Sequence, residues 1–393
     1  MHFPTALLGL LLIVFLLNPG MALRQKETLL FGLFIGVLVI GMLFARNKNI
    51  AFMQIRSLIV YSFLPYLVFI RFVSHPLFLE KYLRLYIIFG MYFAVMGLSH
   101  QAQLKVPILA DENDFCVLMN ILIPLAYFQG QYATLLRNKM FWYSLVALFA
   151  TATVFSFSRG GMVGLVGVGF YMFVCSRRKV AAGVIIAVLV SFTVLVAPAS
   201  YWAEMKTIVT EGATEGTGKE RIESWKAGWR MFMDSPLVGV GPMNFGRWFS
   251  DYYRQYADKA PERMWGRVAH SLFVTLLSET GLLGSALFIA IIAYMWRTHR
   301  FVVGLNDNRE VLADKLGVEP DVRDGIEKRA ESFQAISYGI LGAMIGYLVT
   351  GIFISILWYG YLWRLLAYSA ALGAMSRQFK ETFIEEDIVG GSP

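Results

Sequence analysis

The chain has 393 residues, of which 57% are hydrophobic and only 16% are charged, and its formal net charge is +8. A soluble globule of this length needs more polar surface than these residues supply, so the composition indicates a protein whose solvent is the bilayer. Backbone groups in lipid must be satisfied within each segment, which predicts helices and no strands. The excess positive charge lies largely in loops expected at the cytoplasmic face, so we expect membrane lipids, and no nucleic acid, as its partners.

Apolar runs close to the roughly 20 residues that cross a bilayer recur along the chain. About eleven spans are predicted, and they are 4–20, 28–45, 52–73, 82–99, 114–129, 141–157, 160–176, 180–198, 270–297, 333–356 and 358–376. The first run has neither a basic start nor a small-residue cleavage site, so we expect it to stay in the mature protein. The fold class that follows is an all-α polytopic membrane protein.

Basic residues predict which loops face the cytoplasm. The clusters are Arg137 with Lys139, 177–179, the basic segment 297–329, and Arg377 with Lys380. Counting spans from these clusters places three segments on the opposite face: the turn 111–114, residues 158–160 and the loop 200–269. The same count puts Arg46, Lys48 and Arg56 on that face too, against the charge rule.

Four regions follow from this topology. Residues 1–199 are expected to be N-terminal transmembrane helices, 200–269 a periplasmic loop domain, 270–376 C-terminal transmembrane helices, and 377–393 a cytoplasmic tail. Within the third region, residues 298–332 alternate acids and bases without an apolar face, which is typical of a solvated cytoplasmic connector.

The long loop contains one amphipathic pattern. Thr217 can cap a helix while Glu220, three residues later, reaches back to complete a capping box. The apolar residues that follow at helical spacing are Ile222, Trp225, Trp229 and Phe232. A helix from about Gly218 to Met233 is therefore predicted, ended by Asp234-Ser235-Pro236. Its tryptophans suit the headgroup level, where an indole buries its ring and keeps its N–H wet.

Two arginines are candidates for binding phosphate. Arg221 falls in the first turn of the loop helix, where free N–H groups and the helix dipole favour an anion. Arg159 follows Ser156-Phe157-Ser158 and precedes two glycines, which permit a sharp turn that brings the guanidinium to the rim of the membrane. Its planar fork suits a diphosphate. The alternatives are a surface ion pair for Arg221 and an arginine that snorkels to lipid phosphates for Arg159.

His270 lies at the boundary between the loop and the next span. A histidine there can exchange a proton near neutral pH, and it can equally serve as a capping or interfacial residue. Glu279 follows about nine residues into the same apolar helix, where a carboxylate is costly unless it is paired or wet. At 100° per residue it lies roughly opposite His270, so we expect a buried structural partner and no catalytic pair on one helix face.

The sequence lacks the usual motifs for binding a nucleotide or a metal ion. The sequence has no Walker loop, no G-x-G-x-x-G in a βαβ setting and no Cys/His pattern at metal spacing, so an ATP-driven pump or a zinc enzyme is disfavoured, and we expect no metal and no cofactor. The acidic turn 111–114 could bind a sugar or a cation, but it also suits a solvated turn with an N-cap aspartate.

Four segments, taken together, resemble the O-antigen ligase and O-antigen polymerase superfamily, and especially the O-glycosylation ligases found beside exosortase systems. The segments are Asn113-Asp114 to Pro124-Leu125-Ala126 with the later FSFSRGG, then RIESWKAGWRMFMDSPLVGVGPMNF, then AHSLFVTLLSETGLLGSALF, and GAMIGYLVTGIFISILWYGY near the end. The similarity covers about residues 80–376. Its most specific part is the loop that ends in His-Ser before a glycine-punctuated helix. The resemblance implies about 11–12 transmembrane helices with one large helical periplasmic loop, as in membrane glycosyltransferases.

The resemblance also implies an activity. A family member would be a metal-independent, inverting glycosyltransferase of the bacterial inner membrane that takes a glycan from undecaprenyl diphosphate at the periplasmic face. The acceptor would be a hydroxyl of a lipid A core, a protein or another glycan. A polymerase of the same superfamily and a transporter or flippase of lipid-linked glycans are the alternatives. A transporter should carry its ionisable groups near the midplane on broken helices, whereas most of the candidates here lie at one face.

The same likeness suggests roles for individual residues. It implies that His270 removes the acceptor proton and that Arg159 and Arg221 bind the donor diphosphate. Weaker donor-binding candidates are Arg267 and Arg263. The residues expected to support the acceptor or the structure are Asn113, Asp114, Trp225 and Glu279. The family's Asp-Asn-Asn pattern near the fifth span is Glu-Asn-Asp here.

Overall fold

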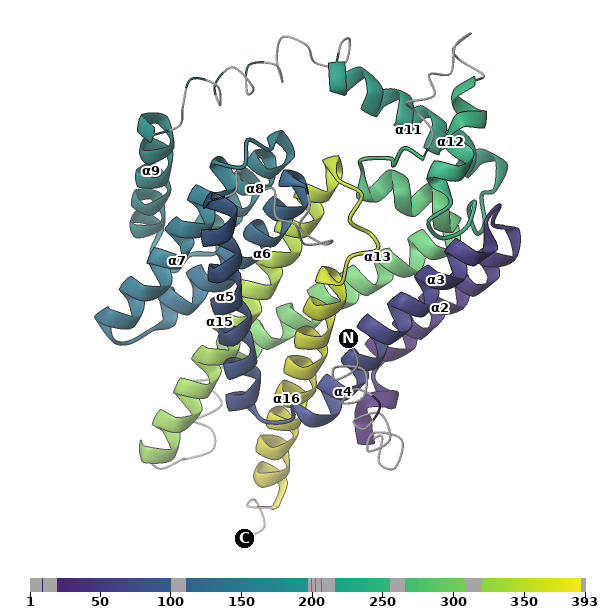
Figure 1. The fold of residues 1–393 in the computed structure, drawn as a ribbon. Coiled ribbons are helices and arrows are strands. Elements are labelled where there is room, and N and C mark those ends of the chain that lie inside the picture. The colour runs from purple at the N-terminus through teal and green to yellow at the C-terminus, as the bar shows by residue number, and fades with distance from the viewer. Residues whose placement is uncertain are drawn as a thin grey trace.

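A computed structural model describes residues 20–99, 111–196, 216–254, 266–307 and 320–389, with four isolated positions at 9, 199, 202 and 206. Every regular element in these ranges is a helix, which confirms the predicted all-α fold (Figure 1). The long helices of the bundle are α2 (Lys26–Phe44), α3 (Lys48–Leu58), α4 (Leu64–Phe72), α5 (Pro76–Ser99), α6 (Glu112–Tyr132), α7 (Leu136–Val154), α8 (Arg159–Cys175), α9 (Lys179–Val196), α13 (Leu272–Asp307), α15 (Pro320–Thr350) and α16 (Tyr361–Val389). The loop helices and short elements are α11 (Gly216–Asp234), α12 (Phe245–Arg254), η1 (Gly20–Arg24), η2 (Ile59–Phe63) and η4 (Gly351–Phe353).

Ten of the eleven predicted spans fall on these helices, and the first, 4–20, lies almost entirely outside the described residues. By length and composition, five segments of the described chain are long and apolar enough to cross a membrane. They are Lys26–Phe44, Lys48–Phe72, Pro76–Ser99, Leu272–Leu305 and Lys328–Phe353. The chain is an all-helical multi-pass membrane protein.

The centre of the bundle is α6, whose residues 114–130 are all buried. It packs against α15, α7, α8 and α5. Asn120 at its middle donates from Nδ2 to the carbonyl of Gly161 at 2.9 Å and to the Thr350 hydroxyl at 3.0 Å. Small residues and interhelical hydrogen bonds of this kind hold helices together where lipid supplies no hydrophobic drive. The same polar residues lower the hydropathy of α6, which is why it is absent from the five candidate spans despite its central position.

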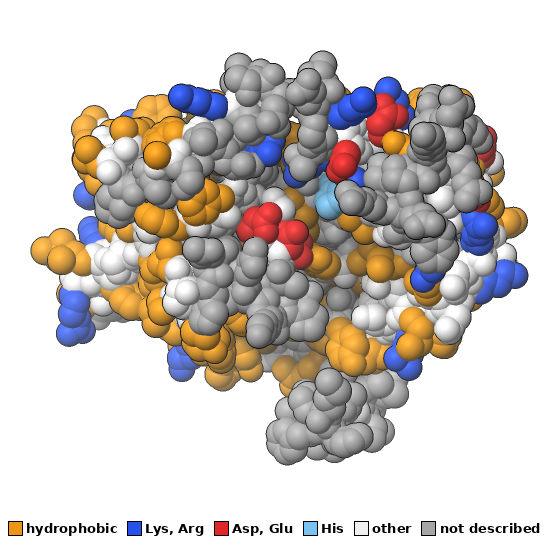
Figure 2. All heavy atoms as spheres, turned by 45° about the horizontal axis from the view of Figure 1, so that its top comes forward, with side chains coloured by type: hydrophobic (Ala, Val, Ile, Leu, Met, Phe, Trp, Pro, Cys, Tyr) orange, Lys and Arg blue, Asp and Glu red, His pale blue; other side chains and the backbone are white. Residues whose placement is uncertain are grey.

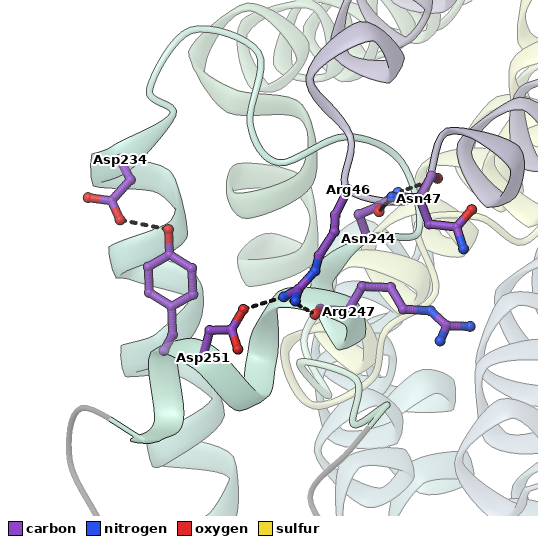
Figure 3. Close-up of polar contacts among 7 residues, drawn as sticks. Arg46, Asn47, Asp234, Asn244, Arg247 and Asp251 are labelled. Atoms are coloured by element: carbon purple, nitrogen blue, oxygen red, sulfur yellow. Dashed lines mark hydrogen bonds and ion pairs between the residues drawn. The ribbon is translucent and has the colours of Figure 1, made fainter.

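The loop helices α11 and α12 lie across one end of the bundle, opposite the C-terminus (Figure 1). Helix α11 has nearly the predicted bounds, although it begins one residue before the expected capping residue Thr217. Helix α12 was not predicted. Its Tyr252 hydroxyl donates to Oδ2 of Asp234 at 2.6 Å, which fastens it to the end of α11 (Figure 3). A small apolar core, centred on Met231, Phe245 and Phe249, joins the two helices.

The turn between α2 and α3 lies at this same end. Arg46 pairs with Asp251 of α12 and donates to the carbonyl of Arg247 at 3.0 Å (Figure 3). The Asn47 backbone N–H donates to Oδ1 of Asn244 at 2.8 Å. The turn therefore shares an end of the bundle with the loop helices, as the span count predicts and the charge rule does not.

The basic clusters at Arg177 and Lys380 lie at the other end. Arg177 pairs with Glu331 at 3.4 Å, where α8 ends beside the early part of α15. The Lys380 ammonium lies 5.7 Å from the ring centroid of Phe301 in α13. Helices α13, α15 and α16 reach farther here than predicted, because α13 continues to Asp307, α15 begins at Pro320 and α16 continues to Val389. The connector 298–332 and the tail 377–393 are thus largely helical where they are described.

This arrangement predicts which positions share a side of the membrane. Single cysteines introduced by Lys48→Cys and Lys219→Cys, both at exposed positions, should react together with a membrane-impermeant maleimide in right-side-out vesicles. Asn138→Cys, in the first turn of α7, should react only after the membrane is opened. The native Cys116 is buried and Cys175 half-buried, so the unsubstituted chain gives the background. Labelling of positions 48 and 219 from opposite sides would contradict the docking of Arg46 on α12.

Helix α13 was expected to be continuous over 270–297, and it is broken. Gly281 has φ 63° and ψ −162°, outside the helical region. A glycine inside a helical pattern costs only about 1 kcal/mol, so Gly281 does not by itself predict a break. The segment between α11 and α12 fills it, as described below.

Candidate functional site

Four of the predicted basic residues lie near one another at the loop end of the bundle. Arg159 begins α8, Arg221 lies in α11, and Arg267 and His270 lie just before α13. Their charges act on one another: Arg159 and Arg267 lower the pKa of Arg221, and Arg221 and Arg267 lower that of His270. On this face of the molecule, acidic and basic side chains and a histidine gather around the middle (Figure 2). Segments far apart in sequence thus form one polar site.

His270 is held in an unusual backbone conformation. Its φ is +49°, in the left-handed region that non-glycine residues rarely adopt, and such strain is often found at functional sites. The carbonyl just before it, that of Ala269, accepts a hydrogen bond of 3.1 Å from the indole Nε1 of Trp225. Trp225 therefore fastens α11 to the turn that presents the histidine. This is a supporting role beside the membrane-interface role that its residue type suggested.

The surroundings of His270 favour the neutral imidazole. Burial lowers its pKa from 6.5, and the positive charges of Arg221 and Arg267 lower it further. Asp111 and Glu220 oppose this shift without reversing it. A neutral imidazole at neutral pH can accept a proton, which is what a general base requires.

Arg221 is a half-buried cation beside other cations. Burial lowers the pKa of its guanidinium, and the charge of Arg159 lowers it further. The guanidinium carbon lies 5.9 Å from the ring centroid of Phe353, in η4. Within the described part of the chain no carboxylate pairs with Arg221, so the surface ion pair considered as its alternative is not found there. A partly desolvated guanidinium among like charges is stabilised by an anion.

Arg159 is held by the cap of its helix. Ser158 is the N-cap residue of α8, and its Oγ accepts from the Gly161 N–H at 2.9 Å. The same hydroxyl donates to Oδ1 of Asn113 at 2.7 Å, which joins the starts of α6 and α8. Phe157, with φ +62°, makes the sharp turn that the glycines were expected to make. Asn113 therefore supports the turn that carries Arg159.

Arg267 joins the site with a partner of its own. One of its terminal nitrogens lies 2.6 Å from Oε2 of Glu220, in the first turns of α11. This ion pair gives it a structural role between α11 and the turn before His270. Arg263, the other weaker candidate, lies outside the described residues.

The acidic turn before α6 faces the arginines. Asp111 is the N-cap of α6 and accepts from the Asn113 N–H at 2.6 Å, as the capping interpretation predicted. Its charge and that of Glu112 raise the pKa of Arg221, so both lie near that guanidinium. Asp114 accepts a hydrogen bond of 3.0 Å from the Tyr359 hydroxyl. Sequence reasoning missed Tyr359, which lies 245 residues from its partner.

Glu279 is bound to three donors, and His270 is not one of them. Its carboxylate accepts from the N–H groups of Met243 and Phe245, each at 2.9 Å. A third bond of 2.8 Å comes from the indole of Trp358. Glu279 thus has a buried structural position.

The site combines anion binding with proton transfer. Two guanidiniums on different helices, Arg159 and Arg221, can hold a diphosphate, and the neutral imidazole of His270, near Arg221, can take a proton. In the described residues no three His, Cys, Asp or Glu side chains gather closely enough to hold a metal ion. The acidic turn and Tyr359 offer hydrogen-bond acceptors and a donor on the other side.

Comparison with known proteins bears on this site directly. Residues 144–289 match the family model described as O-Antigen ligase. The matched segment contains Arg159, Arg221, Arg267, His270 and Glu279, whereas Asn113 and Asp114 precede it. No curated protein matches the chain. This part of the chain, carried on a polytopic helical fold, is therefore similar to the O-antigen ligase family.

Proposed function

We propose that the protein is a glycan ligase, which transfers an oligo- or polysaccharide from undecaprenyl diphosphate to an acceptor hydroxyl without a metal ion. The observation that carries this proposal is that Arg159 and Arg221 lie near each other, with His270 near Arg221 and shifted toward its neutral form. The match to the O-antigen ligase family supports a reaction on lipid-linked glycans. The donor, the acceptor classes and the roles of single residues belong to the proposal.

The reaction breaks the bond between the anomeric carbon and the diphosphate oxygen, whose electron pair stays on the diphosphate. Arg159 and Arg221 stabilise that developing charge, as preorganised donors do in other transferases. They supply the positive charge that a divalent cation gives in many soluble glycosyltransferases. Because they surround the leaving group on one side, the acceptor attacks the anomeric carbon from the other side, and its configuration inverts.

His270 removes the proton of the acceptor hydroxyl as the new bond to the anomeric carbon forms. The resulting imidazolium then releases this proton to water or to the departed diphosphate. The neighbouring arginines speed that release, since they lower the pKa of His270. They also keep the base neutral before the reaction begins.

The acceptor is proposed to enter past the acidic turn before α6. Asp114, bound to Tyr359, and the exposed Asp111 can accept hydrogen bonds from sugar hydroxyls. Asn113 and Trp225 act indirectly, because their hydrogen bonds hold the turns that carry Arg159 and His270. A lipid A core, a protein hydroxyl and a second glycan all present the hydroxyl that this chemistry requires.

The site is proposed to face the periplasm from the bacterial inner membrane. Arg177 and Lys380 lie at the opposite end of the bundle, and basic clusters of this kind are retained in the cytoplasm. Lipid-linked donors would reach Arg159 from the outer leaflet.

One observation favours a transporter as the second candidate. Transporters build substrate sites at broken helices, and α13 is broken at Gly281. The break is filled, however, because the Leu282 N–H donates to the carbonyl of Pro236 at 2.8 Å. The charged candidates also lie at one end of the bundle and not at its midplane, which favours an enzyme.

The experiment is a transfer assay with the purified protein in liposomes. Undecaprenyl diphosphate carrying a labelled glycan is offered with a lipid A core, a protein or a glycan acceptor, in the presence of excess EDTA. We expect label on one acceptor class, with the anomeric configuration opposite to that of the donor. A polymerase would lengthen the lipid-linked glycan itself. Translocation of the donor without a new glycosidic bond, or transfer that requires a divalent cation, would contradict the proposal.

A further inference from the structure

The carboxylate of Glu279 joins three separate segments. The side chain is buried, with 3% of its surface exposed, and lies nine positions after His270 on α13. Oε2 accepts from the Met243 N–H and from the Trp358 indole, and Oε1 accepts from the Phe245 N–H. Met243 belongs to the segment between α11 and α12, Phe245 is the first residue of α12, and Trp358 belongs to the segment between η4 and α16.

The segment between α11 and α12 is seated inside the break of α13. The Val240 N–H donates to the carbonyl of Ser278 at 2.8 Å, and the Leu283 N–H donates to the carbonyl of Leu237 at 3.0 Å. A Cβ added at Gly239 or Gly281 would lie 2.5 Å from backbone atoms of the other segment. Both glycines have positive φ, +69° and +63°, so only glycine suits these positions. The two backbones therefore meet with no room for side chains.

We call the contact between these two backbone segments, residues 237–245 and 278–283, the joint. The carboxylate of Glu279 completes it. Without it, the N–H groups of Met243 and Phe245 and the indole of Trp358 would lose their acceptor in a buried place. A buried donor left unsatisfied is costly, so the segments would rearrange to find other partners. Met243, at φ +55°, has an unfavourable backbone conformation that the bond to Glu279 helps to hold.

Each side of the joint leads to a part of the candidate site. The segment that contains Met243 follows α11, which carries Arg221, and it precedes α12. Trp358 is next to Tyr359, whose hydroxyl donates to Asp114. Glu279 itself shares α13 with the turn of His270. One side chain thus connects the donor-binding helix, the base and the acidic side of the site.

We propose that Glu279 is a positioning residue, whose buried carboxylate sets the relative placement of Arg221, His270 and the Tyr359–Asp114 contact. It touches no substrate and acts only through these segments. The proposal rests on the proposed function for the meaning of those positions. The joint itself is a separate structural claim and can be tested without a glycan.

The test compares Glu279→Gln with the unsubstituted protein in liposomes. Glutamine keeps the shape but replaces one acceptor oxygen with an amino group, which cannot accept from an N–H. Amide hydrogen exchange should accelerate in residues 239–246 and 354–360, and not in the middle of α6. Turnover should fall roughly 100-fold, because misplacement by about 1 Å costs that much. Donor affinity should also fall, but less than in Arg221→Ala, since Arg221 is shifted and not removed and Arg159 lies on α8.

A second variant separates the two arms of the joint. Trp358→Phe removes only the indole donor, so exchange should accelerate in 354–360 and stay unchanged in 239–246. The acceptor KM should rise several-fold, with donor affinity unchanged. Glu331→Gln, an isosteric change of a half-exposed carboxylate at the other end of the bundle, is the matched control and should leave both exchange and turnover as they are.

Two results would overturn the proposal. Unchanged exchange of residues 239–246 in Glu279→Gln would show that the carboxylate does not hold the segment. Faster exchange with normal turnover per folded molecule would show that the joint only stabilises the fold. If the unsubstituted protein transfers no glycan at all, the proposed function fails, and the exchange measurement still decides whether Glu279 holds both segments in place.

Discussion

His270→Ala should lower turnover by roughly 100- to 10,000-fold while folding and donor binding stay close to those of the unsubstituted protein. The side chain is only half-buried and lies in a turn, so its loss leaves the helix bundle intact. The backbone bond from Trp225 to Ala269 does not involve the imidazole and should persist. The measurement is the rate of glycan transfer at saturating donor, with donor binding measured separately.

The pH dependence of the transfer rate shows whether His270 acts as a neutral base or as a cation. Burial, Arg221 and Arg267 lower the pKa of His270, so the neutral base persists below the usual value of 6.5. The transfer rate should therefore stay level through pH 6.5 and fall only at lower pH, as the imidazole becomes protonated. A histidine that merely bound phosphate as a cation would give the reverse trend, with donor affinity improving on acidification.

A matched histidine at the other end of the bundle serves as the control. His75 precedes α5, far from the site, and His75→Gln should keep both the rate and its pH profile. Near-normal turnover of His270→Ala, or a profile that it shares with the unsubstituted protein, would remove His270 from the mechanism.

Arg221→Ala should weaken donor binding by roughly 10- to 150-fold. A charge-assisted hydrogen bond contributes about 1.5–3 kcal/mol, and each 1.4 kcal/mol is about tenfold in affinity. Arg221→Lys should recover only part of the loss, since an ammonium cannot reproduce the planar fork. The measurement is the dissociation constant of undecaprenyl diphosphate in detergent or nanodiscs.

Two comparisons sharpen this test. Lys226→Ala removes a positive charge from the same helix, where it pairs with Glu223 at 3.0 Å on the exposed side, and it should change donor affinity little. Arg159→Ala should act like Arg221→Ala, and the double substitution should cost less than the sum of the two, because both arginines hold one diphosphate. Equal losses for Lys226→Ala and Arg221→Ala would point to net charge and reject a specific clamp.

Much of the fold followed from apolar periodicity. Helix α11 could be predicted within two residues at its start and one at its end, because its tryptophans repeat at helical spacing and Pro236 prevents its continuation. Helix α12 has a similar apolar spacing in Phe245, Phe249 and Tyr252, but it is short and follows a glycine-rich segment, so the pattern alone does not predict it. Periodicity reports helices, but it says little about where one segment enters another.

Sequence can suggest the candidate residues one by one, but not the contacts among them. Arg221 and His270 are suggested by local features, an arginine near the start of a predicted helix and a histidine at the boundary between loop and span. The joint at Glu279 and the bond from Tyr359 to Asp114 are different, because their partners are backbone N–H groups or lie hundreds of residues away. No spacing rule predicts such pairs.

The end of the bundle at which Arg46 lies shows that loop charge is also a limited guide to topology. The charge rule weighs basic residues over all the loops of a chain, so a single loop can depart from it, and here Arg46 pairs with Asp251 on a helix that had not been predicted. The span count was the better guide because each helix must cross the bilayer whatever its loops carry.

The most direct test of the central claim is a cryo-EM map of the protein with undecaprenyl diphosphate bound in a nanodisc. The account predicts diphosphate density between Arg159 and Arg221, within hydrogen-bonding distance of both guanidiniums, with the His270 imidazole facing the position of the anomeric carbon. Density for the diphosphate away from these two arginines, for example at the cytoplasmic end near Arg177, would contradict it.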